Sequence, residues 1–473
     1  MNMQRFLQWI DRPERVFLFL GPLFGILLVF LTPPFQVPDE YMHFYRSYQV
    51  SEGQWISVRE NDRVGGTLPL NLKTAAGLAS ANLPFHPENK MSLSKLRKGM
   101  HVPLEPERRS FYDFLGSAVT PPAAYLPQAV GIALGRWIVA RPIALMYGGR
   151  LINLAVWLLL MGMALRLTPT GKPLFLLLAL MPMSIFQAAS LSPDATTNAV
   201  CFLFTASVLR LLFDDSVASD RRFLLGMILL TILLTQVKGA YAGLILLLLL
   251  VPATRFGSPQ RRWIFLGSLT IVAIVLWLSW ITTIADLYTP YAAYNPQYRD
   301  RCALIQGADP GQQIGVVLRS PLRFTVLLAR ALSEWTVAHS FVAWLGWVDT
   351  FFPVWFVRSY FVLLLIASVP AADRRLNLVQ WILFGVVVLG SSAVVGLLQY
   401  LHWNPVGAGR IVGIQGRYFI PLGPVAFLVA GNIISRLVPA RLPPRALNTI
   451  ASCAAILSLV LTVVMIWRRY YVG

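Results

Sequence analysis

The chain has 473 residues, of which 56% are hydrophobic and only 13% are charged. A soluble protein would carry roughly a quarter charged residues, so the composition excludes a soluble globular domain and indicates a polytopic membrane protein. The net charge of +19 comes from basic residues scattered between apolar runs, without the stripe or patch that a nucleic-acid partner requires. Cys201, Cys302 and Cys453 are widely spaced, which argues against a disulfide framework and against a metal cluster.

The first apolar run, residues 16–32, leads directly into a polar stretch. Two prolines close the run, and a third precedes the adjacent carboxylates Asp39 and Glu40. The prolines stop the helix and fix how the chain leaves the membrane. Ionised groups near hydrocarbon are costly and usually mark function, although two acidic residues at the start of a solvated loop would explain the same pattern.

Asp39, Glu40 and His43 share a face if a helix begins at this point. A carboxylate that faces water can act as a general base towards a hydroxyl, or help to hold a divalent cation beside a phosphate. His43 can bind metal or phosphate, or it can be an interfacial residue with a satisfied hydrogen bond. Both interpretations of His43 stay open at this point.

Eleven apolar runs are predicted to cross the membrane as helices, because a closed barrel would show short alternating strands instead. Several are shorter than the roughly 20 residues that a straight span needs, so their helices must extend into the flanking residues. The predicted spans are 16–32, 150–166, 173–190, 195–213, 223–237, 240–254, 263–284, 351–370, 376–400, 418–437 and 446–467.

A twelfth apolar run, residues 121–140, is interrupted by proline and glycine and closes with Arg136-Trp137. We expect it to lie at the interface as an amphipathic or re-entrant piece, because the short loops then obey the positive-inside rule. One side receives sixteen basic residues: Arg5, Arg12, Arg15, Arg166, Lys172, Arg210, Arg221, Arg222, Arg255, Arg261, Arg262, Arg374, Arg375, Arg436, Arg441 and Arg445. If the run crossed, the turns between residues 166 and 262 would change sides and the rule would fail. Arg468-Arg469 falls on the outer side and is an exception.

This topology places the N-terminus in the cytoplasm and the polar clusters on the outer face. The clusters are Pro38–Glu40, Ser192–Asn198, Lys238–Tyr241 and the loop 401–417. Two long outer segments accompany them. Residues 33–149 are predicted to form a periplasmic lid with interfacial helices, and residues 285–350 a second periplasmic segment rich in tyrosine and tryptophan, which favour the headgroup layer. The whole chain, 1–473, is predicted to form a single polytopic domain, and no internal repeat indicates a transporter built on repeated halves.

Asp194 lies between a proline and the start of the 195–213 run. Helix capping by Ser192 or Asp194 would explain one polar residue here, because the free N–H groups and the dipole at a helix start favour such side chains. Capping explains the further polar residues 196–198 less well. A role for Asp194 in a site is therefore an equal alternative.

Lys238, Arg410 and Arg417 are basic residues on the predicted outer face, against the positive-inside trend. An anionic lipid headgroup or a lipid phosphate is the natural partner for such residues. Four glycines in the 401–417 loop would also let backbone N–H groups approach an anion. The alternative is that these side chains simply extend to the membrane interface (snorkelling). For Arg417, the sequence favours a role in binding over this alternative. Arg358, inside an apolar run, needs a buried partner or an interfacial position.

Four motifs resemble a bacterial multi-span membrane family that is catalogued as a domain of unknown function. The resemblance covers nearly the whole chain, and the four motifs together are specific to that family. They are Pro33–Arg46, Ser192–Asn198, Leu345–Thr350 and Gly413–Pro421. More distantly, the chain resembles the C-type (GT-C) glycosyltransferases, which include protein mannosyltransferases and the aminoarabinose transferase of lipid A.

The GT-C resemblance implies positions for catalytic residues. Those enzymes carry an Asp-Glu pair after the first span, a Pro-Pro-containing amphipathic helix before the second, and another Asp on an outer loop after the third. Asp39-Glu40, Pro121-Pro122 and Asp194 match these three places. No histidine immediately precedes Pro121, where many relatives have one. This departure puts the positioning of an acceptor in doubt.

We therefore predict an all-α integral membrane protein of the bacterial inner membrane, with about eleven transmembrane helices, a GT-C-like shape and an active site that faces outward. The predicted function is transfer of a sugar from a polyprenyl-phosphate donor to a glycan or lipid-linked acceptor of the cell envelope. A lipid donor is expected because nucleotide sugars are absent outside the cytoplasm and the chain has no Gly-rich nucleotide-binding motif. The expected partners are this donor, the acceptor and membrane lipids, without nucleic acid.

Asp39 is the predicted catalytic residue, as general base or through a metal ion, with Glu40 in support. A divalent cation, Mg²⁺ or Mn²⁺, would bind at Asp39 and Asp194. The predicted substrate- and phosphate-binding residues are His43, Asp194, Lys238, Arg410, Arg417 and Tyr418.

Two other functions remain open. A flippase or polymerase-like carrier of lipid-linked glycans would need a polar path through the membrane, with paired charges inside several spans. The mostly apolar spans argue against such a path. A scaffold or receptor would place Asp39, Asp194, Lys238 and Arg417 more than about 20 Å apart, because no pocket would gather them.

Overall fold

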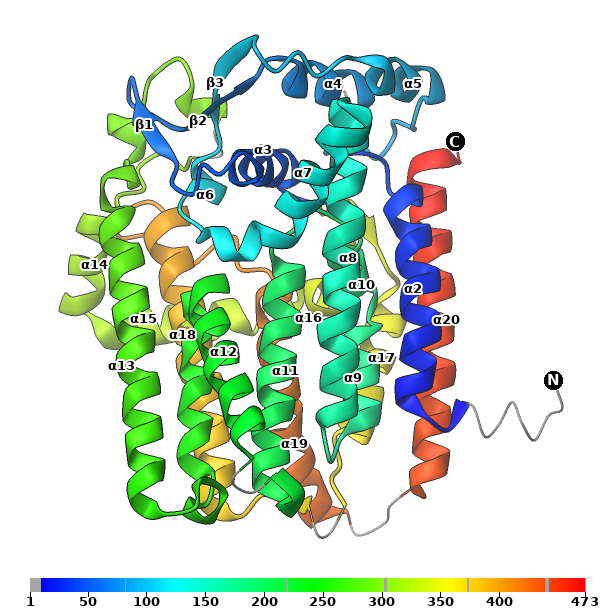
Figure 1. Ribbon diagram of the computed structural model, residues 1–473, viewed down its shortest axis with the longest axis vertical. Coiled ribbons are helices and arrows are strands. Elements are labelled where there is room, and N and C mark those ends of the chain that lie inside the picture. The colour runs from blue at the N-terminus through cyan, green and yellow to red at the C-terminus, as the bar shows by residue number, and fades with distance from the viewer. Residues whose placement is uncertain are drawn as a thin grey trace, which may run out of the picture.

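The computed structural model describes residues 10–80, 82–217, 220–301, 304–371, 374–438 and 442–472. Long helices run side by side in one bundle, and shorter helices with a small sheet cover one end of it (Figure 1). Of the residues named above, Arg5, Cys302 and Arg441 lie outside the described residues. Cys201 is buried, Cys453 is exposed, and both are free thiols.

Every predicted span falls on a helical segment, and the prediction of an all-α membrane protein is confirmed. Seven helical segments among the described residues are long and apolar enough to cross a membrane. They are α2 (Pro13–Leu31), α8 (Pro142–Leu167), α11 (Asp194–Phe213), α13 (Pro259–Thr283), α18 (Leu378–Trp403), η9 (Gly416–Leu422) continued by α19 (Gly423–Leu437), and α20 (Pro444–Tyr471). The other predicted spans are shorter: α9 (Lys172–Ala179) with α10 (Pro182–Ala188), α12 (Arg221–Val237), η3 (Gly239–Leu250) and α17 (Val354–Ala367). The count of eleven spans therefore stays a prediction.

The 173–190 run differs from the prediction because it is broken. Met181 is extended, and a second helix starts at Pro182. Proline has no N–H to continue the first helix and disfavours a helical conformation in the residue before it. The break lies inside the core, since every residue of α9 except Lys172 and every residue of α10 is buried.

The burial of the helices follows their place in the bundle. In α11, all but three of the 20 residues are buried. In α13, at the rim in Figure 1, only Leu266, Leu269 and Ala273 are buried, while Ile264 and Ile271 are both 64% exposed. Helices that expose apolar side chains outward are stable in lipid, where no water competes for the backbone.

The segment 33–149 forms the cap. Its helices are α3 (Glu40–Ser51), α4 (Asn71–Ser80), α5 (Leu93–His101), α6 (Leu115–Ala118), η1 (Pro122–Tyr125) and α7 (Leu126–Val139). It also contains a sheet that the sequence analysis missed: β1 (Val58–Glu60), β2 (Arg63–Pro69) and β3 (Arg109–Asp113), antiparallel in the order β1-β2-β3. The pair Gly65-Gly66 is typical of a turn, yet it lies within β2, opposite Asp113 and Tyr112. A Cβ at Gly65 would lie 1.8 Å from the Tyr112 carbonyl oxygen, so only glycine permits this approach.

The run 121–140 becomes η1 and α7. With 14 residues, α7 is shorter than the roughly 20 residues of a straight span. It packs closely on α8, where a Cβ at Gly131 would lie 2.3 Å from the Gly148 carbonyl oxygen. Its interfacial position stays a prediction, because the predicted span α17 is no longer than α7.

The segment 285–350 is built from short helices and a two-stranded hairpin. Its main elements are α14 (Pro310–Arg319), α15 (Pro321–Leu332), α16 (Trp335–Val342), β4 (Trp344–Leu345) and β5 (Thr350–Phe351).

The remaining described elements, in this segment and elsewhere, are single turns of 3₁₀ helix: η2 (Asp215–Val217), η4 (Ala253–Phe256), η5 (Ala285–Leu287), η6 (Tyr291–Ala293) and η7 (Arg299–Arg301).

The ends of α2 and α20 agree with an odd number of crossings. In Figure 1, α2 begins at the end of the bundle opposite the cap, and α20 finishes beside the cap. Arg469, which the predicted topology makes an exception to the positive-inside rule, has a local partner there: its Nη2 lies 2.7 Å from Asp349 Oδ2 in a buried ion pair. The same guanidinium donates to the carbonyls of Leu83, His86 and Asn89. In the predicted topology, these contacts would account for the position of Arg469.

Candidate functional site

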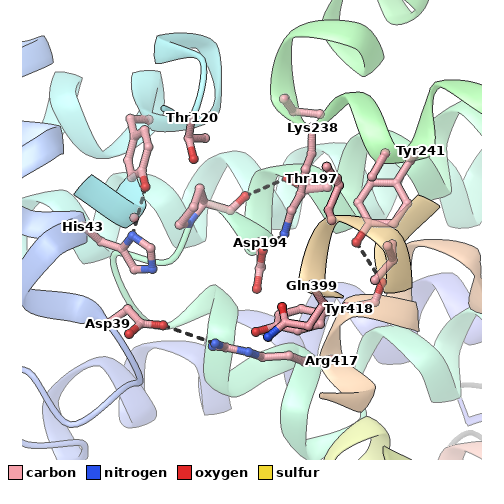
Figure 2. Close-up of a pocket in the computed structure, with 17 residues that line it drawn as sticks. Asp39, His43, Thr120, Asp194, Thr197, Lys238, Tyr241, Gln399, Arg417 and Tyr418 are labelled. Carbon is pink, nitrogen blue, oxygen red and sulfur yellow. Dashed lines mark hydrogen bonds and ion pairs between the residues drawn. The ribbon is translucent and has the colours of Figure 1, made fainter. Parts of the chain in front are cut away.

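A cavity of about 270 Å³ lies at the capped end of the bundle. Helices α3, α11, α12 and α18, together with η9, contribute to its walls. Six predicted site residues line it (Figure 2): Asp39, His43, Asp194, Lys238, Arg417 and Tyr418. The two others, Glu40 and Arg410, do not.

Asp39 is turned into the cavity by its backbone. It precedes the first residue of α3 with φ 63° and ψ 8°, a left-handed conformation that Asp tolerates better than most residues. Its carboxylate makes no capping hydrogen bond to α3. The side chain is 45% exposed, so the carboxylate remains available for other partners.

Glu40 points the other way, into the protein. Its carboxylate forms a fully buried ion pair with Arg150 of α8, with 2.5 Å between Oε2 and Nη2, and accepts a hydrogen bond from the Leu191 amide. Arg150 also donates to the carbonyls at the end of α2: Val29, Thr32 and Pro33. The structure thus gives Glu40 no contact with the cavity. The Glu40–Arg150 ion pair instead holds the backbone on both sides of Asp39 and the backbone just before Asp194.

Arg417 reaches the cavity from the start of η9. Its side chain is 5% exposed, and its Nη2 lies 3.3 Å from Asp39 Oδ2. Its Nε is buried and has no hydrogen-bond partner among the described residues. The residue before it, Gly416, is held by α16: its amide donates to Ser340 Oγ at 2.7 Å, and a Cβ there would lie 2.0 Å from the Val337 carbonyl oxygen. The glycine therefore lets η9 approach α16 and positions the guanidinium.

Asp194 and Lys238 form the second ion pair of the cavity. Asp194 is the first residue of α11, and its Oδ1 lies 3.3 Å from Lys238 Nζ. Gln187 donates to the other carboxylate oxygen at 3.0 Å. The Asp194 carboxylate thus faces side chains rather than capping α11, while the Ser192 hydroxyl accepts from the Asp194 amide. Capping by Asp194 is not what the structure shows.

Tyr418 lies between the two basic residues. Its ring centre is 5.3 Å from Lys238 Nζ and 5.4 Å from the Arg417 guanidinium carbon. Such contacts stabilise a cation beside the aromatic face. Tyr241 donates to the Tyr418 carbonyl at 2.7 Å and ties η9 to η3.

His43 lines the cavity from the first turn of α3. One ring nitrogen, Nδ1, is 2.9 Å from the Tyr125 hydroxyl. Burial lowers the pKa of His43, while the nearby carboxylates of Asp39 and Asp194 oppose that shift. His43 is therefore neutral at pH 7 and adds no positive charge to the cavity.

Arg410 is exposed and lies outside the cavity lining, so the structure does not join it to the other predicted phosphate-binding residues. Arg358 is exposed too, with its guanidinium 5.6 Å from the Trp335 ring centre. The cavity also contains Thr120, Tyr125 and Gln399, which the sequence analysis missed. Tyr125 and Gln399 lie in apolar runs, where nothing in the pattern separates them from packing residues.

The divalent cation predicted at Asp39 and Asp194 stays a prediction. Each carboxylate already has a basic partner, Arg417 and Lys238 respectively. Within the described ranges, no group of three or more His, Cys, Asp or Glu side chains is placed to hold a metal ion. A divalent cation would have to displace both ion pairs.

No curated protein matches the chain. Among solved structures, it is similar to ArnT from Cupriavidus metallidurans bound to undecaprenyl phosphate, with 12% sequence identity and a TM-score of 0.45 over 96% of this chain and 76% of that one. A family model described as predicted membrane protein (DUF2142) matches residues 20–426, in agreement with the family resemblance of the four motifs. The chain therefore belongs to the DUF2142 family of membrane proteins.

Proposed function

We propose that the protein transfers a sugar from a polyprenyl-phosphate donor to a hydroxyl group of a cell-envelope acceptor, on the outer face of the membrane. The observation that carries this proposal is the composition of the cavity. A half-exposed carboxylate, Asp39, lies beside Arg417, and a second basic side chain, Lys238, lines the same cavity at one end of an apolar bundle. Glycosyl transfer from a lipid phosphate needs these two functions, a proton acceptor and cations for the leaving phosphate.

The basic side chains are suited to a phosphate. Arg417 has a buried N–H to which the described residues offer no acceptor, and a guanidinium binds phosphate oxygens with several N–H groups at once. Both ion pairs of the cavity, at 3.3 Å, are longer than the roughly 2.8 Å of a tight charge-assisted hydrogen bond. An incoming phosphate can therefore take over Arg417 and Lys238 without breaking strong contacts.

The same exchange of ion-pair partners also frees Asp39 to act as the general base. In the structure, the Asp39 carboxylate is engaged in an ion pair with Arg417. A donor phosphate on Arg417 competes for that pairing and leaves Asp39 free to accept a proton. The acceptor oxygen then forms a bond to the anomeric carbon, the bond from that carbon to the phosphate oxygen breaks, and the acceptor proton moves to Asp39. The lipid phosphate leaves with its charge stabilised by Arg417 and Lys238.

The arrangement also bears on the alternatives. Asp39, Asp194, Lys238 and Arg417 line one cavity and form two ion pairs, which contradicts the wide separation that a scaffold predicts. A carrier would need polar groups along the length of the bundle, whereas the side chains in the middle of α11, from Ala199 to Phe204, are apolar and buried. Transfer at one face is the function that this arrangement supports best.

Replacing Arg417 by Gln should weaken donor binding by about 1.5–3 kcal/mol, because a charged hydrogen bond to phosphate is lost. Lys238→Gln should weaken it less, since Lys238 is 39% exposed. Arg410→Gln is the matched control, with the same loss of charge outside the cavity. Binding of a short-chain polyprenyl-phosphate sugar to purified protein in nanodiscs measures the three effects. Unchanged binding in Arg417→Gln, or an equal loss in Arg410→Gln, would exclude the proposed phosphate site.

A further inference from the structure

Arg46, in the second turn of α3, is a buried cation that forms no ion pair with a carboxylate of the described ranges. Its side chain is 0% exposed. The guanidinium donates to neutral oxygens only: Gln49 Oε1 at 2.6 Å, Ser57 Oγ at 3.3 Å, and the carbonyls of Trp55 at 2.9 Å and Thr120 at 3.4 Å. Its Nε has no partner, and no carboxylate in the described part of the chain forms an ion pair with it.

Arg46 differs in this respect from the other deeply buried arginines. Arg150, Arg469 and Arg417 each face a carboxylate, at 2.5, 2.7 and 3.3 Å. A charge that is buried without a counter-charge costs several kcal/mol. Burial lowers the pKa of Arg46 to about 10, so the group is nevertheless charged at neutral pH.

Arg46 lies directly behind the cavity wall. The carbonyl that it binds on the cavity side belongs to Thr120, whose side chain lines the cavity. Tyr125, another lining residue, is affected both by the charge of Arg46 and by the charges inside the cavity. Burial raises the pKa of its hydroxyl, the charge of Arg46 opposes that shift, and the charges of Asp194 and Asp39 add to it.

The charges around the cavity do not cancel. The carboxylates Asp39 and Asp194 balance Arg417 and Lys238, and His43 is neutral. The charge of Arg46 is left over. We propose that the anion bound in the cavity is the missing counter-charge of Arg46, which thereby makes the cavity select anionic ligands without touching them. This inference rests on the proposed function in one respect: the ligand carries a phosphate.

Gln49→Glu tests the proposal because it supplies the counter-charge from within the protein. The new carboxylate keeps the shape of Gln49, the short contact with Arg46 and the hydrogen bond from Ser57, and loses only a 3.5 Å bond to the Gly65 carbonyl. We expect Gln49→Glu to be at least as heat-stable as the wild type but to bind dodecyl phosphate roughly tenfold more weakly. A purely structural Arg46 would give the gain in stability without the loss of anion binding.

Two further variants keep the test decisive if Gln49→Glu does not fold. Arg46→Lys retains the charge and should bind dodecyl phosphate within about threefold of the wild type, whereas Arg46→Gln should lose roughly tenfold. Equal affinity of Arg46→Lys and Arg46→Gln would overturn the proposal. Failure of all three variants to fold would overturn it as well, because Arg46 would then serve the fold alone.

Each protein is tested in nanodiscs with dodecyl phosphate, inorganic phosphate and dodecanol. Wild-type protein that binds dodecyl phosphate no better than dodecanol would overturn the proposed function. Inorganic phosphate that binds as tightly as dodecyl phosphate would point to free phosphate and overturn the lipid donor, while leaving the role of Arg46 intact. Tight binding of dodecyl phosphate by the wild type and by a folded Gln49→Glu alike would overturn the Arg46 proposal alone.

Discussion

Asp39→Asn is expected to lower sugar transfer by roughly 10²- to 10⁴-fold, the usual contribution of a positioned general base. The amide keeps the shape of the carboxylate but cannot accept the acceptor proton. The variant should still fold, because the Asp39 side chain does not cap α3, is 45% exposed and makes only a long contact with Arg417, although the loss of that contact lowers stability. Its one ion pair in the structure is the long contact with Arg417.

The measurement is transfer of a radiolabelled sugar from a polyprenyl-phosphate donor by purified protein in nanodiscs. Asp113→Asn is the matched control, because it removes another Arg-paired carboxylate of the cap: Asp113 lies 2.5 Å from Arg63 and outside the cavity. Transfer should continue in this control at temperatures where it stays folded. If Asp39→Asn is monodisperse and transfers sugar at the wild-type rate, Asp39 is not the base.

Glu40→Gln, one residue further on, is expected to destabilise the protein by about 3–5 kcal/mol, since it leaves the buried Arg150 without its counter-charge. Both side chains of this pair are 0% exposed, so water cannot replace the lost partner. The loss should also make the backbone at the C-terminal end of α2 less well ordered, because Arg150 binds the carbonyls of Val29, Thr32 and Pro33 there.

Denaturant unfolding of the purified variant measures this effect. The matched control is Glu52→Gln, which breaks partly exposed ion pairs with Arg109 and Arg136 in the same cap and should cost about 1 kcal/mol or less for each pair. Glu40→Gln combined with Arg150→Met should recover part of the loss, because no buried charge is then left alone. Equal stability losses in Glu40→Gln and Glu52→Gln would show that the buried pair has no special role.

The helices were predictable because lipid imposes a strong constraint. A long apolar run can satisfy its backbone in a membrane only as a helix, so each run from 16–32 to 446–467 became helical. The cap was harder to predict. The close approach of Gly65 to Tyr112, which permits the sheet, depends on two segments nearly fifty residues apart and leaves no local pattern.

The candidate site was predictable in part, for a related reason. Topology alone brings the ends of alternate spans to one face, and this grouped Asp39, Asp194, Lys238 and Arg417. Topology could not predict that Asp39 faces the cavity while Glu40 faces the protein interior. The left-handed backbone at Asp39 sends these adjacent carboxylates in opposite directions. The partner of Glu40 was hidden as well. Arg150 is a charge at the start of a predicted span, a signal that a buried partner exists but not which one.

The most direct test of outward-facing sugar transfer is a mass-spectrometric comparison of cell-envelope glycans. Cells that contain the wild-type protein, lack it, or contain only Asp39→Asn are compared under one growth condition. We predict that one glycan loses one sugar both in cells without the protein and in cells with Asp39→Asn, and regains it with the wild type. An unchanged glycan profile in cells without the protein, or full restoration by Asp39→Asn, would contradict the proposed function or the role of Asp39, respectively.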